Sequence, residues 1–221
     1  MRKEKADMRD KSQDEAQMAI KRKNFIEAGY KLYVEKSIEA VSMQEVADAS
    51  GYGVATLYRY FGTKQSFVVE VAVKSWEKFR EENIQRRPSK DFDGMTAADI
   101  FEFYIDSFLE LYRKRKDLLR FNQFFNVYVQ SEHMDGEILQ PYQDVIGKLR
   151  EVFHDMYLKG KEDKTIRTDE TEEKMFSKTL HLMLAAVTRY AVGLVYIPKK
   201  DFDPEGELED MKDMMLNRYR S

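Results

Sequence analysis

Apolar residues recur along this chain with the spacing of a helix rather than that of a strand. Phe25, Ala28, Gly29, Leu32 and Tyr33 follow one another at i, i+3, i+4, i+7 and i+8, so they form one apolar stripe. Similar stripes continue toward the C-terminus, and no useful length of chain alternates with the period of two typical of strands. The pattern predicts an all-α fold of about nine helices.

Capping and breaking residues predict where the later helices begin and end. A fourth helix is expected over residues 66–86, and residues 88–96 are expected to be a linker, because they contain proline, glycine and several charges. Residues 160–167 are expected to be a charged turn. The remaining expected helices cover residues 97–115 after a Thr96 cap, 117–130, 137–159 with Pro141 in its first turns, a long segment capped by Thr168 or Thr171 and ending before Pro198, and 204–219 after an Asp203 cap.

Residues 42–64, SMQEVADASGYGVATLYRYFGTK, fit two short helices joined by a glycine turn. Val46 and Leu57 are the apolar residues that would face each other, and Ala47 lies where the helices cross. Gly51 falls at the turn, where positive φ is required and glycine adopts it at little cost. Ser42 is a good N-cap, and a capping box with Glu45 would complete the start of the first helix. This spacing is typical of a helix-turn-helix.

The second of these helices, over residues 54–61, carries the candidate chemistry. Leu57 and Phe61 lie four residues apart and would anchor one face to the core, which leaves polar side chains directed outward. Hydroxyl and guanidinium groups on an exposed helix can bond phosphates and base edges in a major groove. The outward residues are Thr56, Tyr58, Arg59 and Tyr60, followed by Thr63 and Lys64 at a helix N-terminus suited to a phosphate.

On these residues, positions 25–67 resemble the DNA-binding domain of the TetR family of transcriptional regulators. The most specific part is the run ATLYRYF followed by Lys64, which is similar to the family's Thr-Leu-Tyr-x-Tyr/His-Phe pattern. The sequence departs from the family pattern at Ser37, Gly53 and Gly62. The resemblance implies base or phosphate contacts by Thr56, Tyr58, Tyr60 and Lys64, with Ser42 and Gln44 reaching the DNA from the preceding helix. The full expected DNA-binding set is Ser42, Gln44, Gly53, Val54, Thr56, Tyr58, Arg59, Tyr60 and Lys64, and Lys21, Arg22 and Lys23 are further candidates.

The resemblance also implies a domain order and a function. Residues 19–65 would be the helix-turn-helix domain and residues 66–221 a larger helical domain for ligand binding and dimerisation. Residues 1–18 are either a disordered arm or an exposed helical extension, and their composition favours partial disorder. The expected function is that of a homodimeric repressor released from a palindromic operator by a small hydrophobic or amphipathic effector. The alternative is a helical protein-interaction module without DNA binding.

The larger domain contains more large aromatic residues than one narrow core stripe requires. Aromatic and methionine walls with a few polar groups suit a flat or flexible hydrophobic ligand, although each residue alone is more simply explained as core. A pocket is favoured because TetR-like proteins generally carry one there. The expected ligand-binding set is Trp76, Tyr104, Phe108, Tyr112, Phe121, Phe124, Phe125, Tyr128, His181 and Met183.

The run LHLMLAAVTRYAVGLVY at residues 180–196 is apolar nearly all round and contains small residues that permit close approach by another helix. With the amphipathic final helix it would form a two-helix surface that pairs with its symmetry mate as a four-helix bundle. TetR-like proteins dimerise in this way. The expected interface includes Ala185, Arg189, Val192, Tyr196, Met211 and Met215.

Composition narrows the remaining function classes. The 221 residues include no cysteine, which excludes disulfides and thiolate chemistry, and three histidines that fit no metal or catalytic motif. An enzymatic role, a metal and a cofactor are therefore not expected. The net charge is −3, with a slight basic excess only in the first 66 residues. The sequence has no signal-peptide pattern and no apolar run long enough for a membrane span, so a cytoplasmic protein is expected.

Overall fold

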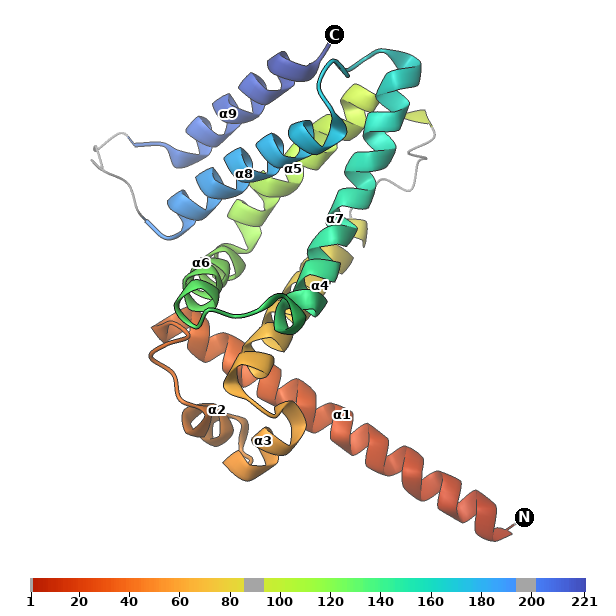
Figure 1. Ribbon diagram of the computed structural model, residues 1–221, viewed down its shortest axis with the longest axis vertical. Coiled ribbons are helices and arrows are strands. Elements are labelled where there is room, and N and C mark those ends of the chain that lie inside the picture. Colours follow the sequence, from red (N-terminus) through yellow and green to blue (C-terminus); the bar gives the residue numbers. More distant parts are fainter. Residues whose placement is uncertain (1, 86–93, 194–201) are drawn as a thin grey trace. The chain divides into compact units, whose positions relative to one another are not determined.

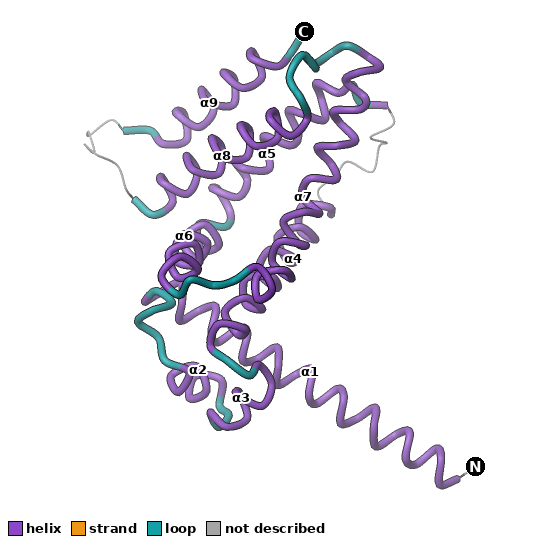
Figure 2. Tube along the Cα trace, in the orientation of Figure 1, coloured by secondary structure: helices purple, strands orange, loops and turns teal. Residues whose placement is uncertain are grey.

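The computed structural model describes residues 2–85, 94–193 and 202–221. Within these ranges the chain forms helices joined by loops and turns, with a single isolated bridge between Ile166 and Arg220 (Figures 1 and 2). The all-α prediction is therefore confirmed. The helices are α1 (Arg2–Lys36), α2 (Met43–Ser50), α3 (Val54–Phe61), α4 (Lys64–Gln85), α5 (Ala97–Lys114), α6 (Lys116–Ser131), α7 (Gly136–Asp163), α8 (Glu172–Ala191) and α9 (Pro204–Tyr219).

The described chain forms two compact units. Unit 1 comprises Met1–Ser75 and Phe124–Tyr142, and unit 2 comprises Trp76–Gln123 and Gln143–Ser221. Helices α4, α6 and α7 each contribute residues to both units. Unit 1 thus contains the helix-turn-helix, the first part of α4 and the distant segment 124–142. The sequence pattern had placed segment 124–142 wholly in the larger domain.

Aromatic side chains form the core of unit 1. Phe25, Tyr33 and Phe67 are fully buried, and the rings of Phe61 and Phe67 meet edge to face with centroids 4.8 Å apart. Gly29 on α1 makes this packing possible, because a Cβ there would lie 2.6 Å from the Phe67 ring. The stripe predicted on the first helix is therefore the surface against which the helix-turn-helix and α4 assemble.

Most predicted helix boundaries agree with the structure to within a few residues. Thr96 caps α5 through a capping box with Asp99, and Asp203 caps α9 with Pro204 in its first turn. Thr171, one of the two candidate caps, is the N-cap of α8. Most of the expected 88–96 linker, and the end of the apolar run before Pro198, lie outside the described residues.

Two expectations about local structure differ from the structure. Residues 2–18 belong to α1, which is the helical extension rather than the disordered arm; a helix that is already nucleated and packed extends at little cost. Gly160 was expected in a turn, yet α7 continues to Asp163. Gly160 lies against the buried Ile166, and a Cβ there would come within 2.3 Å of the Ile166 Cγ1 atom, so tertiary packing explains the glycine.

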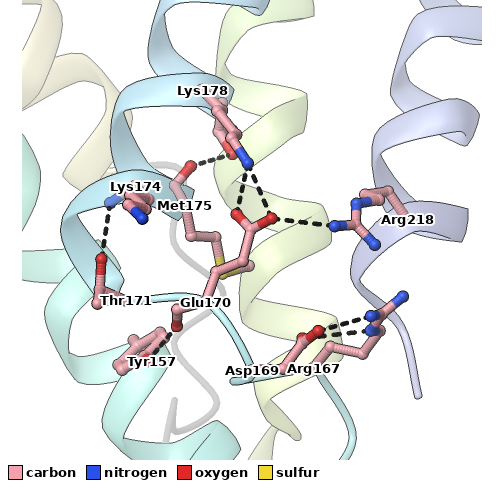
Figure 3. Close-up of polar contacts among 10 residues, drawn as sticks. Tyr157, Arg167, Asp169, Glu170, Thr171, Lys174, Met175, Lys178 and Arg218 are labelled. Atoms are coloured by element: carbon pink, nitrogen blue, oxygen red, sulfur yellow. Dashed lines mark hydrogen bonds and ion pairs between the residues drawn. The ribbon is translucent and has the colours of Figure 1, made fainter.

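Unit 2 is built on contacts of α5 with α8 and α9, and α8 also contacts α9 (Figure 1). The loop before α8 ties these elements together. The Glu170 carboxylate accepts hydrogen bonds from Lys178 on α8 at 2.7 and 2.8 Å and from Arg218 on α9 at 3.0 Å (Figure 3). The backbone N–H of Arg167 donates to the carbonyl of Tyr219 at 2.6 Å, which fastens the end of α9 to the same loop.

Candidate nucleic-acid interface

The two helices of the predicted helix-turn-helix are held by local caps. The Ser42 hydroxyl accepts from the backbone N–H of Glu45 at 3.2 Å, and the Glu45 carboxylate accepts from the Ser42 N–H at 2.8 Å. Gly51 ends α2 in the left-handed conformation with φ 76° and donates to the carbonyls of Ala47 and Asp48. Val46 and Ala47 are fully buried. The capping box, turn glycine and crossing point are therefore as the sequence predicted.

Helix α3 presents one face to the core of unit 1 and the other to solvent. Leu57 is fully buried and Phe61 nearly so, which fixes the rotation of the helix. Tyr58 is 46% exposed and Arg59 is exposed beside it. Thr56 and Tyr60 are half-buried, and the Tyr60 ring packs 6.1 Å from that of Phe25. The solvent face of α3 thus carries a phenol, a guanidinium and a hydroxyl on a rigid support.

Several other predicted DNA contacts already have partners within unit 1. The Gln44 amide donates to the Asp48 carboxylate at 2.7 Å, and Ser42 is engaged in its capping box. The Lys64 ammonium donates to the carbonyl of Ile38 at 2.8 Å and lies 5.6 Å from the centre of the Tyr128 ring. Burial lowers the pKa of Lys64 below its ordinary value. Lys64 therefore joins α4 to the loop after α1, in addition to any phosphate contact.

The sequence-predicted residues on α2, α3 and their flanks otherwise lie on the surface of unit 1. Gly53 is exposed and Val54 is half-buried at the start of α3. Among the basic residues of α1, Lys21 lies 6.0 Å from the centre of the Tyr52 ring. Arg22 instead bonds Glu70 on α4 and the carbonyl of Tyr60, and lies over the Phe61 ring. Sequence reasoning missed this supporting role because no local pattern links residues 22 and 70.

The predicted ligand-binding residues are divided between the two units. Phe124, Phe125 and Tyr128 belong to unit 1. His181 is exposed on α8, with its ring nitrogen 3.3 Å from the Ser177 hydroxyl. The others are buried in unit 2 and consist of Trp76, Tyr104, Phe108, Tyr112, Phe121 and Met183.

The predicted dimer residues have mixed exposure. Ala185 is exposed, Arg189, Val192 and Met211 are half-buried, and Met215 is turned into unit 2. Tyr196 lies outside the described residues. The large exposed apolar side chains of α8 and α9 are instead Leu182, 52% exposed, and Met214, 61% exposed. Leu182 precedes Ala185 by three residues, so the two share one face of α8. That spacing was the signal that could have found Leu182.

The described residues contain neither a membrane-spanning helix nor a metal-binding cluster. None of the helices there is long and apolar enough to cross a membrane. No cluster of three histidine or acidic side chains in the described ranges is arranged to hold a metal ion.

Comparisons with known proteins agree with this geometry. Residues 25–71 match the family model described as bacterial regulatory proteins, tetR family. No curated protein matches the chain. Three solved structures superpose over nearly the whole chain. The regulator FadR from Bacillus subtilis, in complex with stearoyl-CoA, has a TM-score of 0.68 and 14% identity, and the match covers 88% of this chain and 97% of that one. A regulator from Saccharomonospora viridis, in complex with choline, has a TM-score of 0.68 and 15% identity over 90% of this chain and 97% of that one; a TetR family regulator from Marinobacter aquaeolei VT8 has a TM-score of 0.61 and 19% identity over 94% and 99%. At these identities the likeness establishes the fold.

Proposed function

We propose that this chain, a TetR-family regulator by its fold and by its residues 25–71, is a homodimeric repressor that leaves its operator when a small molecule binds. The observation that carries the proposal is the solvent face of α3. Tyr58 and Arg59 stand exposed on a helix whose opposite face, at Leu57, is fully buried. A phenol and a guanidinium held in this way match the donors that bond phosphates and base edges in a major groove.

The dimer would be formed by α8 and α9. Leu182 on α8 and Met214 on α9 are exposed there, on two helices that contact each other. A two-fold axis through these helices would make the interface self-complementary and would give two copies of α3. Two recognition helices about one DNA turn apart read a palindromic operator, which is the arrangement we propose.

The effector would bind in unit 2, whose buried side chains are mainly aromatic and aliphatic. Two structures with the same fold hold a ligand, stearoyl-CoA in one and choline in the other. We propose a largely hydrophobic or amphipathic effector for this chain. Binding would release DNA only if the effector prefers the conformation in which the two α3 helices no longer match successive major grooves.

Fluorescence anisotropy on DNA tests the proposal. The operator would be sought upstream of the gene and, in parallel, by selection from a random DNA pool. Arg59→Ala should weaken binding by at least about tenfold. It should also make the salt dependence shallower, because a protein with one phosphate contact fewer releases fewer counterions when it binds. Lys148→Ala is the matched control, since it removes an exposed positive charge from α7 in unit 2.

The outcomes separate the two functions considered from the sequence. Selected DNA that binds tightly, with loss in Arg59→Ala and not in Lys148→Ala, supports the regulator. If selection enriches no sequence and Arg59→Ala binds random DNA as the parent does, the DNA-binding proposal is wrong. A helical protein-interaction module would then be the better description.

A further inference from the structure

One buried polar atom stands out in unit 2. The indole Nε1 of Trp76 is completely buried, and it has no hydrogen-bond partner among the residues that the structure describes. A buried donor without an acceptor is disfavoured, and such groups are uncommon in folded proteins. Other buried hydroxyls do have acceptors: Ser75 donates to the carbonyl of Val71 at 2.7 Å and Thr179 to that of Met175 at 2.8 Å.

Within the described ranges, no oxygen atom accepts a hydrogen bond from the indole N–H of Trp76. The Trp76 ring meets the ring of Phe79 edge to face, with centroids 5.9 Å apart. An aromatic face is a much weaker acceptor than an oxygen atom. Unlike a serine or threonine hydroxyl, the indole N–H is too far from its own helix backbone to bond a carbonyl one turn away. A molecule that binds in unit 2 would supply the missing acceptor.

From this we infer that Trp76 is the polar contact of the effector site, and that the effector is an apolar molecule with an uncharged oxygen acceptor. This inference rests on the proposed effector function of unit 2. The acceptor is uncharged because the buried polar side chains recorded for the described part of unit 2 are neutral, namely Asn122, Thr179 and Thr188. A carboxylate without a buried cation would pay a large desolvation cost. An ester, ketone, ether or alcohol oxygen fits the donor.

The position of Trp76 in α4 would couple a ligand contact there to the helix-turn-helix. Trp76 is the first residue of unit 2 along α4, and Ser75 before it is the last residue of unit 1 in that helix. An oxygen bonded to the indole would therefore act on the helix that continues directly from the helix-turn-helix. Binding at Trp76 would bias the conformation of α4 rather than that of a remote surface element.

The sequence provides its own probe, because Trp76 is the only tryptophan in the chain. Three matched compounds, methyl decanoate, sodium decanoate and decane, would be titrated into the full chain. Indole fluorescence and the ¹H–¹⁵N resonance of the indole N–H would report binding. We expect methyl decanoate to move the indole proton resonance downfield. We also expect it to bind about tenfold more tightly than decanoate or decane, because one neutral hydrogen bond changes a dissociation constant by up to about that factor.

Replacing Trp76 by benzothienylalanine keeps the ring shape and removes only the donor. In that variant the preference for the ester should fall to about twofold or less. The unfolding temperature of the ligand-free variant should be at least that of the parent, because the substitution removes an unpaired buried donor. The inference is overturned if none of the three compounds shifts the resonance, if decanoate binds as well as the ester, or if the variant keeps the full ester preference. A contact between the ligand-free indole proton and a long-lived bound water would also overturn it. Because no DNA is used, failure here leaves the DNA-binding proposal to its own test.

Discussion

The guanidinium of Arg22 on α1 bonds the carboxylate of Glu70 on α4 through two nitrogens, one of them at 2.5 Å. Arg22 also donates to the carbonyl of Tyr60 at 3.2 Å, near the end of α3. Its group lies 4.6 Å from the centre of the Phe61 ring. Three helices of unit 1 thus meet at one side chain, and that side chain supports the recognition helix rather than facing outward for DNA.

This arrangement predicts a measurable coupling between the two residues. Arg22→Met, Glu70→Gln and the double variant should give a coupling energy of about 1 kcal/mol in urea unfolding, because the pair is bidentate and half-buried. Lys23→Met and Glu27→Gln form the control cycle, since that pair is highly exposed and spaced at 3.7 Å. A control coupling as large as that of Arg22 and Glu70 would contradict the structural role.

Ser37, which directly follows α1, has a strained backbone conformation. Ser37 has φ 82°, in the left-handed region that side chains other than glycine rarely adopt. Ser37→Gly should therefore raise the free energy of unfolding by about 0.5–1 kcal/mol. Ser37→Ala keeps the strain and should give no gain.

Gly51→Ala should lower the free energy of unfolding by about 1 kcal/mol, because alanine rarely adopts the φ of 76° found there. No atom lies within 4 Å of the added Cβ, so the loss would come from the backbone conformation and not from a clash.

The capping box of α2 predicts a pH-dependent contribution to stability. The backbone N–H of Ser42, the ammonium of Lys36 and the Ser42 hydroxyl hold the pKa of Glu45 at about 2. The folded pKa lies below the unfolded one, so the contribution is present above the unfolded pKa and is lost as the pH falls through the folded pKa.

Glu45→Gln should therefore be less stable than the parent at pH 7, and the difference should shrink as the pH is lowered from about 5 toward 2. Urea unfolding at several pH values measures it. Glu35→Gln on the exposed side of α1 is the matched control. A difference between Glu45→Gln and the parent that stays constant down to the lowest pH would show that the carboxylate charge does not contribute to the cap.

Two glycines of the same helix should respond oppositely to alanine. Gly160→Ala on α7 should cost about 1–3 kcal/mol, because its Cβ would meet the buried Ile166 side chain at 2.3 Å. Gly147→Ala should stabilise by about 0.5–1 kcal/mol, since nothing lies within 4 Å and alanine favours helix. Adding Ile166→Ala to Gly160→Ala should cost less than the sum of the two changes. Strict additivity would show that the contact is not what requires the glycine.

The sequence predicted most local features because they depend on neighbouring residues. The predicted Ser42–Glu45 box joins positions three residues apart, and the predicted cap at Thr96 lies next to the helix that it begins. The stripe through Phe25 follows from the period of the helix. The exposed face of α3 follows from the burial of Leu57 and Phe61 in the same way. The TetR-like pattern in residues 25–67 adds to these local rules, and the match over residues 25–71 confirms it.

Features that depend on distant partners could not be predicted in this way. The bond between Arg22 and Glu70, the engagement of Lys64 by Ile38, and the buried indole of Trp76 all depend on which helices pack together. The assignment of residues 124–142 to the same unit as the helix-turn-helix is of the same kind. Periodicity and caps determined the helices, the turn and the exposed face of α3 that we propose binds DNA. Only the tertiary structure decided which charged side chains stay exposed on unit 1, as Arg59 does, and which ones bond other helices and loops, as Arg22 and Lys64 do. Side chains far apart in sequence find these partners only once the chain is folded.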